Sequence, residues 1–478
     1  MHVDIQLAID KPEGVNSVFL VKEIAILKDF GFNQEALDFV QKKIEAKEKL
    51  ITVQAYDKID FVRILDVDEI ANSDKEALRK DGHTIISRLR EEKVTAVSLF
   101  DLIAEKEAVI AMTEGLALSS YRFDKYKTDE ASRLKNNPIV HVATSVMSQC
   151  ELHELSRLCQ AVFITRDLVN EPVGTLDVAA FSEVVKALGE QHGFGVDIFN
   201  KNKLESLKFG GLLAVNKGSV DPPAFHILEW KPENATNEKP VVLVGKGVVY
   251  DTGGINLKTP PGSLDDMKSD MGGAASVVGA MVAVSSNRLP KHVVGLIPAT
   301  DNRPGGNAIV PGDVLNMHNG KTVEVINTDA EGRLILADAL SYSDKYDPAL
   351  VIDLATLTGS AVMALGHYGT VGMGTAGDDV FDALLKAGEA VHERIVRFPF
   401  WSEYDELIKS DVADIKNLGV REAGSITAGK FLSHFIKHPW VHLDIAGPAF
   451  VKKEDSYRGK GGSGVGVRML YEFLKKLD

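Results

Sequence analysis

Apolar residues follow two different spacings in the first part of the chain. Short runs rich in β-branched and aromatic residues predict strands: V-F-L-V (18–21), I-T-V-Q-A-Y (51–56), D-F-V-R-I-L (60–65) and T-A-V-S-L-F (95–100). Between the last two runs, K-E-A-L-R-K-D-G-H-T-I-I-S-R-L-R has its apolar residues spaced as in a helix. This region predicts a small α/β domain, followed by a polar stretch at 125–138 and a connecting helix over 148–170.

The rest of the chain is more apolar, and its strand-like runs are nearly continuous. They are V-V-L-V (241–244), H-V-V-G-L-I-P (292–298), T-V-E-V-I (322–326), A-L-V-I-D-L (349–354) and V-H-L-D-I (441–445). Such runs are typical of strands covered on both faces. With the helical stretches between them, they predict a mainly parallel central sheet that helices cover on both faces. We therefore expect an α/β protein with a smaller N-terminal domain at 1–160 and a larger domain at 161–478.

The composition is that of a globular protein and narrows the possible functions. The 478 residues are 45% hydrophobic and 26% charged, and this length favours two domains. A net charge of −14 makes nucleic acid an improbable partner. The N-terminus does not resemble a signal peptide and no apolar run could span a bilayer, so we expect no membrane association. Two cysteines, Cys150 and Cys159, are too few for a disulfide framework, which fits a cytoplasmic location.

Charged residues gather in three segments, the first two after the predicted strand 241–244 and the third after 322–326. G-K-G-V-V-Y-D-T-G-G-I-N-L-K contains Lys246, Asp251 and Lys258, and D-D-M-K-S-D-M-G-G-A-A contains Asp270. N-T-D-A-E-G-R-L contains Asp329, Glu331 and Arg333. Ligands of parallel sheets usually bind beyond the carboxyl ends of the strands. The glycines of these segments permit tight turns, so the charged side chains could converge there.

Each charged residue also has an ordinary structural explanation. Asp329 and Asp270 could cap the helices that follow them, and Glu331 could favour a helix N-terminus. Asp251 could be a turn residue, and the lysines could be surface charges. These explanations require unrelated reasons for charge at several strand ends of one sheet, so we favour convergence.

Four converging carboxylates need cations to balance them. Asp251, Asp270, Asp329 and Glu331 would repel one another, and partial burial would make their charges more costly. Two divalent cations would neutralise them, and one lysine could then bind a metal as a neutral amine. Two metals about 3.5–4 Å apart suit the activation of water and the polarisation of a carbonyl or phosphoryl group. The residues therefore predict a two-metal hydrolase, without saying which bond is cut.

Other kinds of site have less support. The chain has no G-x-S-x-G, H-E-x-x-H or G-x-x-x-x-G-K-[ST] motif, and its thirteen histidines avoid the three charged segments. His442 and Asp444 share a face of a predicted strand, where we expect a structural pair or a pocket wall. Two alternatives stay open: another two-metal hydrolase such as a phosphoesterase, and a non-catalytic protein whose N-terminal domain binds a nucleotide-like ligand.

Several segments, in their order along the chain, resemble the leucyl (cytosol) aminopeptidase family of two-metal exopeptidases. N-T-D-A-E-G-R-L is similar to the family signature, and G-K-G-V-V-Y-D-T-G-G, K-S-D-M-G-G-A-A, D-L-A-T-L-T-G and H-L-D-I-A-G reinforce the resemblance. It covers most of residues 160–478. It implies that 161–478 is a catalytic domain that removes N-terminal residues, leucine or another apolar residue preferred, from peptides with a free N-terminus.

The resemblance implies roles for the matching residues. The metal ligands would be Lys246, Asp251, Asp270, Asp329 and Glu331. Two further residues would be catalytic. Lys258 would polarise the scissile carbonyl and stabilise the oxyanion. Arg333 would hold a bicarbonate ion, which in the family acts as general base, together with the backbone of Gly332 and Leu357.

The resemblance also implies a substrate pocket, cofactors and an assembly. Met267, Thr356 and Gly359 would form the pocket for the first residue of the substrate, and Asn327 would position the substrate backbone. The cofactors would be bicarbonate and two divalent metal ions per subunit, with zinc and manganese favoured. The family forms hexamers that are dimers of trimers. One departure, a loop between Lys258 and Asp270 that is one residue longer than usual, affects the expected pocket shape.

Overall fold

The computed structural model describes residues 4–8, 16–55, 58–66, 69–92, 94, 96–129 and 139–477. The chain divides into two compact units, Met1–Phe163 with Glu454–Gly459 and Ile164–Lys453 with Lys460–Asp478, called here the N-terminal and C-terminal units. Most of the polar stretch predicted at 125–138 lies outside the described residues. In the described part of the chain, no helix has both the length and the apolar composition needed to cross a membrane.

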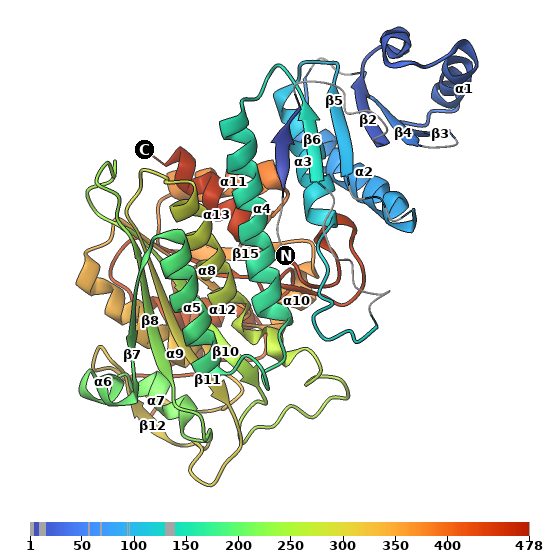
Figure 1. Cartoon of the computed structure of the whole chain (residues 1–478). Coiled ribbons are helices and arrows are strands. Elements are labelled where there is room, and N and C mark those ends of the chain that lie inside the picture. The colour runs from blue at the N-terminus through green and yellow to red at the C-terminus, as the bar shows by residue number, and fades with distance from the viewer. Residues whose placement is uncertain are drawn as a thin grey trace. The chain divides into compact units, whose positions relative to one another are not determined.

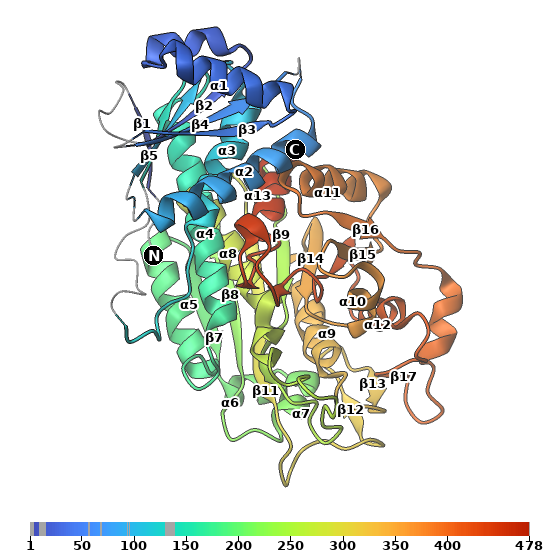
Figure 2. The same cartoon turned by 90° about the vertical axis from the view of Figure 1, so that its right-hand side faces the viewer.

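The N-terminal unit contains a six-stranded sheet. Its strand order is β1 (Ile5–Leu7), β6 (Ile139–Ala143), β5 (Ala96–Asp101), β2 (Asn16–Val21), β4 (Ile59–Ile64) and β3 (Leu50–Gln54). All neighbouring strands are parallel except β3 and β4. Helix α1 (Gln34–Glu45) covers one face of the sheet, and α2 (Asn72–Glu91) packs against α3 (Lys106–Ser119) on the other (Figure 2).

The predicted elements of this unit are confirmed where the structure describes them. The four predicted strands correspond to β2, β3, β4 and β5, and the predicted helix corresponds to α2. Residues 56 and 95, at the ends of two predicted strands, lie outside the described residues. The predicted connecting helix is α4 (Gln149–Asn170), which continues past the division between Phe163 and Ile164.

The C-terminal unit is built on a nine-stranded sheet (Figure 1). Its order is β16 (Ile395–Arg397), β15 (Thr370–Gly374), β18 (Trp440–Asp444), β14 (Leu350–Ala355), β9 (Val241–Gly245), β11 (Val293–Asn302), β8 (Ala224–Trp230) and β7 (Gly195–Phe199), with β10 (Gly247–Asp251) also paired to β11. The central strands from β18 to β11, and β10, are parallel. Antiparallel pairs occur towards both edges. The prediction of a mainly parallel sheet is therefore confirmed.

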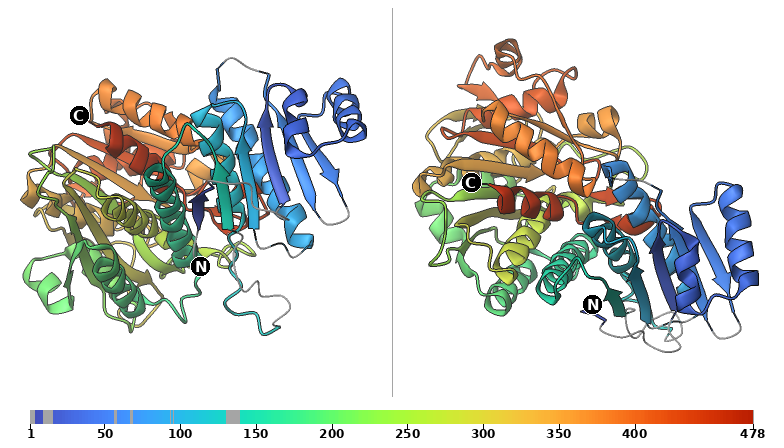
Figure 3. Two further views of the ribbon diagram at one scale, coloured as in Figure 1. Left: turned by 45° about the horizontal axis from the view of Figure 1, so that its top comes forward. Right: turned by 90° about the horizontal axis from the view of Figure 1, so that it is seen from above.

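Helices cover both faces of this sheet, as predicted. On one face, α8 (Gly272–Ser286) packs on β9 and β14, with α5 (Val178–His192) beside it (Figure 1). The C-terminal helix α13 (Val467–Lys476) lies against α8 and α11 (Asp378–Val391) (Figure 3). On the other face lie α9 (Glu331–Ser343), α7 (Gly210–Asn216) and α12 (Gly424–Ser433) (Figure 2).

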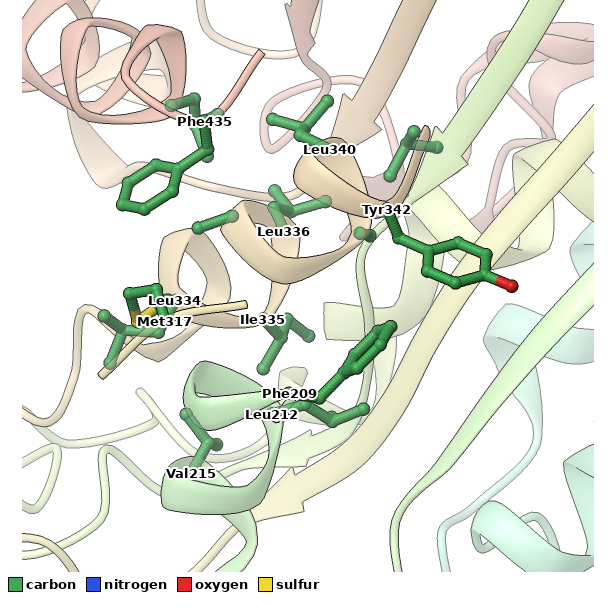
Figure 4. Close-up of a cluster of buried hydrophobic side chains, with 14 of the residues drawn as sticks. Phe209, Leu212, Val215, Met317, Leu334, Ile335, Leu336, Leu340, Tyr342 and Phe435 are labelled. Atoms are coloured by element: carbon green, nitrogen blue, oxygen red, sulfur yellow. The ribbon is translucent and has the colours of Figure 1, made fainter. Parts of the chain in front are cut away.

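The largest apolar core joins α9 to its neighbours. Leu334, Ile335 and Leu336 of α9 are fully buried and pack with Phe209 and Leu212 (Figure 4). Helix α9 is buried along its whole length. Because so much apolar surface holds this helix, its first turn has a fixed position, and that turn contains charged residues.

One predicted strand does not belong to the central sheet. The run 322–326 contains β13 (Thr322–Glu324), which pairs with β12 (Val314–Asn316) and β17 (Ile415–Lys416) in a separate three-stranded sheet. Of the three β13 residues only Val323 is buried, so this strand is not covered on both faces. The expectation that N-T-D-A-E-G-R-L leaves a strand of the central sheet is therefore wrong. The small sheet leads the chain into α9 instead.

Candidate metal centre

The three charged segments converge at one place in the C-terminal unit. Lys246 lies between β9 and β10, and its Nζ is 2.8 Å from both carboxylate oxygens of Asp270 and 3.0 Å from Oε1 of Glu331. Asp270 belongs to the 3₁₀ helix η3 (Met267–Met271), which leads into α8. Glu331 is the first residue of α9. Residues far apart in the sequence thus meet around one lysine.

A second lysine joins the remaining carboxylates. Lys258 Nζ lies 2.7 Å from Oδ2 of Asp251, the last residue of β10, and 2.5 Å from Oδ1 of Asp329. Carboxylate oxygens of Asp251, Asp329 and Glu331 lie within 4.8 Å of one another. All six predicted residues, the five ligands and Lys258, therefore surround a common point.

The charges at this point are unbalanced and mostly buried. If every group is ionised, four carboxylates and two ammonium groups leave two negative charges. Burial raises the pKa of Asp270 well above its usual value, and the neighbouring carboxylates add to the rise. Burial opposes the charge on Lys246, but Asp270 and Glu331 outweigh it and raise the pKa of this lysine. A cluster of oxygen donors with excess negative charge fits divalent cations.

Glycines make the close approach of these side chains possible. Gly253 and Gly254 have φ of +89° and +67°, a left-handed conformation that turns the chain after β10. The backbone N–H of Gly253 donates to Oδ1 of Asp251 at 2.8 Å. The explanation of Asp251 as a turn residue is therefore confirmed. It is incomplete, because the other oxygen of Asp251 contacts Lys258.

The capping explanations for two carboxylates are wrong. Helix α9 begins at Glu331, and the residue before it, Ala330, provides no side-chain cap. Helix α8 begins at Gly272, and neither Asp270 nor the N-cap residue Met271 caps it. The carboxylates of Asp270 and Asp329 contact lysines instead. The prediction for Glu331 is confirmed, since it lies in the first turn of α9, where a negative charge is favourable.

Asparagine side chains fix the segment that carries Asp329. Asn327 Oδ1 accepts the backbone N–H of Asp329 at 2.7 Å. Asn256 Oδ1 accepts the N–H of Thr328 at 2.9 Å, and Asn302 Nδ2 donates to the Thr328 carbonyl at 3.1 Å. Asn302 Nδ2 also lies 2.8 Å from Oδ1 of Asp251. Neutral amides thus hold two of the clustered carboxylates without adding charge.

Asn417 holds the same segment from the other side. Its Oδ1 accepts the N–H of Ile326 at 2.7 Å, and its Nδ2 donates to the carbonyl of Asn327 at 2.7 Å. Asn417 directly follows β17, and its own N–H donates to the Glu324 carbonyl. Its side chain therefore continues the pairing between β17 and the β13 segment. Asn256, Asn302 and Asn417 are not among the residues predicted from the sequence, although Asn256 follows the paired glycines Gly253 and Gly254 that mark the turn after β10.

Two of the predicted pocket residues lie beside the cluster. Thr356 Oγ1 donates to Oδ1 of Asp270 at 2.7 Å, and the Thr356 carbonyl accepts from Lys246 Nζ at 3.0 Å. Met267 begins η3, the same short helix that contains Asp270. Gly359 begins α10 (Gly359–Leu365), and a Cβ built on it would meet no atom within 4 Å. The space beside Gly359 is open, as a pocket wall requires.

Arg333 is buried with unused hydrogen-bond donors. Its exposed fraction is 5%, and Nε and Nη1 have no hydrogen-bond partner among the residues that the structure describes. Burial lowers its pKa to about 10, so it stays charged at neutral pH. Orphaned donors of this kind are rare in proteins. A small anion would satisfy them, so Arg333 fits a bicarbonate ion.

The two backbone N–H groups predicted to bind the anion, those of Gly332 and Leu357, differ in whether they already have an acceptor. Gly332 lies in the first turn of α9, where backbone N–H groups have no acceptor within the helix. The N–H of Leu357 donates to Oδ1 of Asp444 at 3.1 Å. Gly332 thus presents a helix N-terminus to an anion, whereas Leu357 already has an acceptor.

Models of one protein family match both parts of the chain. The model described as the cytosol aminopeptidase family, catalytic domain, matches residues 163–471, and the N-terminal domain model of that family matches residues 44–130. The chain belongs to the cytosol aminopeptidase family. Membership supports a metal-dependent aminopeptidase activity and disfavours the phosphoesterase and ligand-binding alternatives.

Relatives of this family are similar over most of the chain. A probable cytosol aminopeptidase of Chloroherpeton thalassium is 43% identical over 472 residues, 94% of this chain and 90% of the relative. Another, of Chlorobium limicola, is 48% identical over 382 residues, 77% of this chain and 75% of the relative.

Solved structures of the same fold cover nearly the whole chain. The bottromycin maturation enzyme BotP in complex with Mn is 31% identical with a TM-score of 0.83, covering 96% of this chain and 99% of that chain. A tomato leucine aminopeptidase variant is 26% identical with a TM-score of 0.86, covering 99% and 97%. These matches agree with the two-unit α/β fold.

Proposed function

We propose that this protein hydrolyses the N-terminal residue of peptides, with leucine or another apolar residue preferred, by a two-metal, bicarbonate-assisted mechanism. The observation that carries the proposal is the convergence of four carboxylates and two lysines around one point. Membership of the cytosol aminopeptidase family supports the peptide substrate.

We assign metal binding to Lys246, Asp251, Asp270, Asp329 and Glu331. Zinc and manganese are the favoured ions, and the manganese in the BotP structure supports the second. When bound, the two metals would polarise a carbonyl and activate water, and bicarbonate would supply a base. The chain's contribution is to hold the ligands rigidly, through buried helices and the asparagine side chains around Asp329.

Two cationic residues of the chain have separate roles in the proposal. Lys258 is partly exposed, unlike Lys246, and its side chain reaches the cluster from the loop after β10. Its charge would stabilise negative charge that develops on the substrate carbonyl oxygen. Arg333, with its unused donors, would hold the bicarbonate together with the backbone of Gly332, and with that of Leu357 once its N–H turns from Asp444 to the anion.

The substrate side chain would lie against Met267, Thr356 and Gly359, and Asn327 would position the substrate backbone. The pocket is bordered by the loop between Lys258 and Met267, which Tyr250 anchors by donating to the Leu264 carbonyl at 3.0 Å. Met267, Thr356 and Gly359 have no charged side chain that could pair with an acidic or basic substrate residue. The proposal therefore favours an apolar first residue.

We further propose the domain limits, assembly and location predicted from the sequence. Residues 1–160 would form the N-terminal domain and 161–478 the catalytic domain, which the family matches at 44–130 and 163–471 support. A homohexamer built as a dimer of trimers rests on the family resemblance. The names of the relatives support a cytoplasmic location.

Hydrolysis of leucyl-anilide with and without its free amine tests the proposed activity. We expect cleavage in the presence of added Mn²⁺, reversible loss on chelation, and nearly no cleavage of N-acetyl-leucyl-anilide. A neutral α-amine can bind a metal, whereas an acetylated nitrogen is a poor ligand and adds bulk. The loss should exceed the ~1–3 kcal/mol of a simple pocket misfit. Equal rates on both substrates would refute an exopeptidase and favour a general two-metal hydrolase.

A further inference from the structure

A buried polar group lies on the face of the central sheet that α9 covers. Trp440 and His442 alternate with apolar residues in β18 and so share a face. Asp353 stands opposite His442 in the neighbouring strand β14. Trp440 Nε1 donates to Oδ2 of Asp353 at 2.6 Å, and His442 Nδ1 lies 2.7 Å from Oδ1. Trp440 packs in the same apolar core as Leu334 of α9, which identifies the face.

This polar group is fully buried, yet one of its nitrogens has no partner. Asp353, Trp440 and His442 are all 0% exposed. Among the described residues, Nε2 of His442 has no hydrogen-bond partner, just as Nε and Nη1 of Arg333 have none. Leaving a buried donor or acceptor unpaired costs about 1–3 kcal/mol. Two such residues on the α9 side of one sheet suggest a common ligand that the chain itself does not supply.

The surrounding charges favour a positive His442. An ionised Asp353 acts here only as an acceptor, so the hydrogen of the His442–Asp353 bond is on Nδ1. A neutral imidazole has one N–H, so Nε2 has a hydrogen as well only in the imidazolium form. Burial lowers the pKa of His442, but Asp353 and Asp444 outweigh it and raise the pKa overall, although Arg333 opposes them. Helix α12, on the same side of the sheet, contains Lys430. Its Nζ lies 3.1 Å from Oδ2 of Asp405, so this positive charge is already paired.

Asp444 of β18 lies on the same face as His442, and both of its oxygens accept hydrogen bonds. Oδ1 accepts the N–H groups of Leu357 and Ala446 at 3.1 and 3.2 Å. Oδ2 accepts from Thr358 Oγ1 at 2.7 Å. Among the described residues, neither oxygen bonds to Nε or Nη1 of Arg333 or to Nε2 of His442, so these three groups are open to another partner.

We propose that His442 is a further ligand of the anion site of Arg333, and that its Nε2–H supplies a second charged donor for a small oxyanion. The inference rests on the proposed function, in which that oxyanion is bicarbonate. Asp353 fixes the ring and sustains its charge, and Arg333 provides the two other free donors.

Two substitutions of His442 separate the roles of its nitrogens. In His442→Asn the amide nitrogen replaces Nδ1 and keeps the bond to Asp353, but nothing replaces Nε2. In His442→Gln the amide nitrogen reaches the position of Nε2. We expect zinc-loaded His442→Asn to bind isotope-labelled bicarbonate about 10–100-fold more weakly than the unmodified enzyme, with unchanged metal content. His442→Gln should recover part of this affinity.

Asp353→Asn is a second test that does not alter the histidine. It removes the charge that favours imidazolium, so bicarbonate affinity should fall here too. Unchanged bicarbonate affinity in both His442→Asn and Asp353→Asn would overturn the inference, as would the absence of bicarbonate binding to the unmodified enzyme. The measurement of bicarbonate binding uses no peptide. Failure of the proposed peptidase activity would therefore be seen in a separate experiment, as a lack of leucyl-anilide hydrolysis.

Discussion

The Cα of Gly332 faces the side chain of Lys246 so closely that a Cβ there would lie 2.4 Å from the lysine Cε and 2.8 Å from Nζ. Gly332 is in the first turn of α9, between Glu331 and Arg333. The missing side chain at this position therefore gives Lys246 its path to Asp270 and Glu331. The glycine of N-T-D-A-E-G-R-L has a steric role that is independent of its proposed backbone contact with an anion.

We predict that Gly332→Ala displaces Lys246 and weakens metal binding. Helix α9 is held by its apolar core, so the lysine must move rather than the helix. A displacement of about 1 Å in such a site reduces kcat/KM by about 100-fold. Metal content measured by elemental analysis should fall in parallel.

Gly306→Ala is the matched control for this substitution, because a Cβ at Gly306 would meet no atom within 4 Å. It should leave metal content and activity unchanged. Full metal occupancy and activity in Gly332→Ala would show that the contact with Lys246 does not constrain the site.

The two lysines should respond differently to removal. Lys246→Ala should reduce metal occupancy, because the amine is a proposed ligand. Lys258→Ala should keep both metals and lose about 100–1000-fold in kcat, because its charge is needed only as negative charge develops on the substrate. Lys239→Ala, which removes an exposed ion pair with Asp347, provides a control. Equal metal loss in Lys246→Ala and Lys258→Ala would mean that the two roles are wrongly assigned.

The sequence shows the charged residues of the site more clearly than the groups that hold them. Asp251, Asp270 and Glu331 occur in short charged, glycine-containing segments between apolar runs, so their convergence can be predicted. Asn417 contacts Ile326 across 91 positions, and this contact depends on the pairing of the short strands β13 and β17. No periodicity indicates that pairing, and the run at 322–326 even suggested the wrong sheet.

The same limit applies to the buried polar residues. Alternation in V-H-L-D-I predicts that His442 and Asp444 share a face, and both are fully buried in β18, but they are not bonded to each other, so the expected pair is wrong. The hydrogen-bond partner of His442 is Asp353. Asp353 is not predicted as a partner, because it lies within the apolar run 349–354. Which residue of β14 stands opposite His442 depends on the register between two strands that lie far apart in the sequence. Hydrophobic pattern predicts the strands but not that register.

Asn417→Ala should destabilise the segment that carries Asp329. Asn417 is fully buried, and the substitution leaves the part-buried N–H of Ile326 and carbonyl of Asn327 without their side-chain partner, a cost of about 1 kcal/mol each. We expect weaker metal binding, measured by titration with a chelator, and a lower kcat/KM at limiting Mn²⁺. Excess Mn²⁺ should restore much of the activity, because metal binding favours the ordered segment.

Two further variants complete this experiment: a control at a surface asparagine and a charged replacement of Asn417. Asn319 is exposed, and Asn319→Ala should bind metal normally. Asn417→Asp keeps the acceptor for Ile326 but places a carboxylate oxygen against the Asn327 carbonyl, so it should be no better than Asn417→Ala. If metal affinity were unchanged in both Asn417 variants, this side chain would not position the ligand segment.

Asp338 gives the fold a pH dependence that is separate from the metal cluster. It lies fully buried in α9, where its carboxylate oxygens accept the backbone N–H groups of Leu212 and His318 at 2.9 and 3.0 Å. Burial raises the pKa of Asp338 to about 7, although these hydrogen bonds oppose the rise. In an unfolded chain the same group has a pKa of about 3.9.

Between about pH 4 and pH 7 the folded protein therefore holds a proton on Asp338 that the unfolded chain releases. The free energy of unfolding should fall as pH rises through this window, by on the order of 2–4 kcal/mol from this residue, and the effect should level off above it. Asp338→Asn has no such proton, so its unfolding free energy should fall less between about pH 5 and pH 7.5 in urea titrations. Protonation of the metal ligands affects both proteins alike and cancels in the comparison. Parallel pH profiles for the two proteins would show that Asp338 is ionised in the folded state throughout this range.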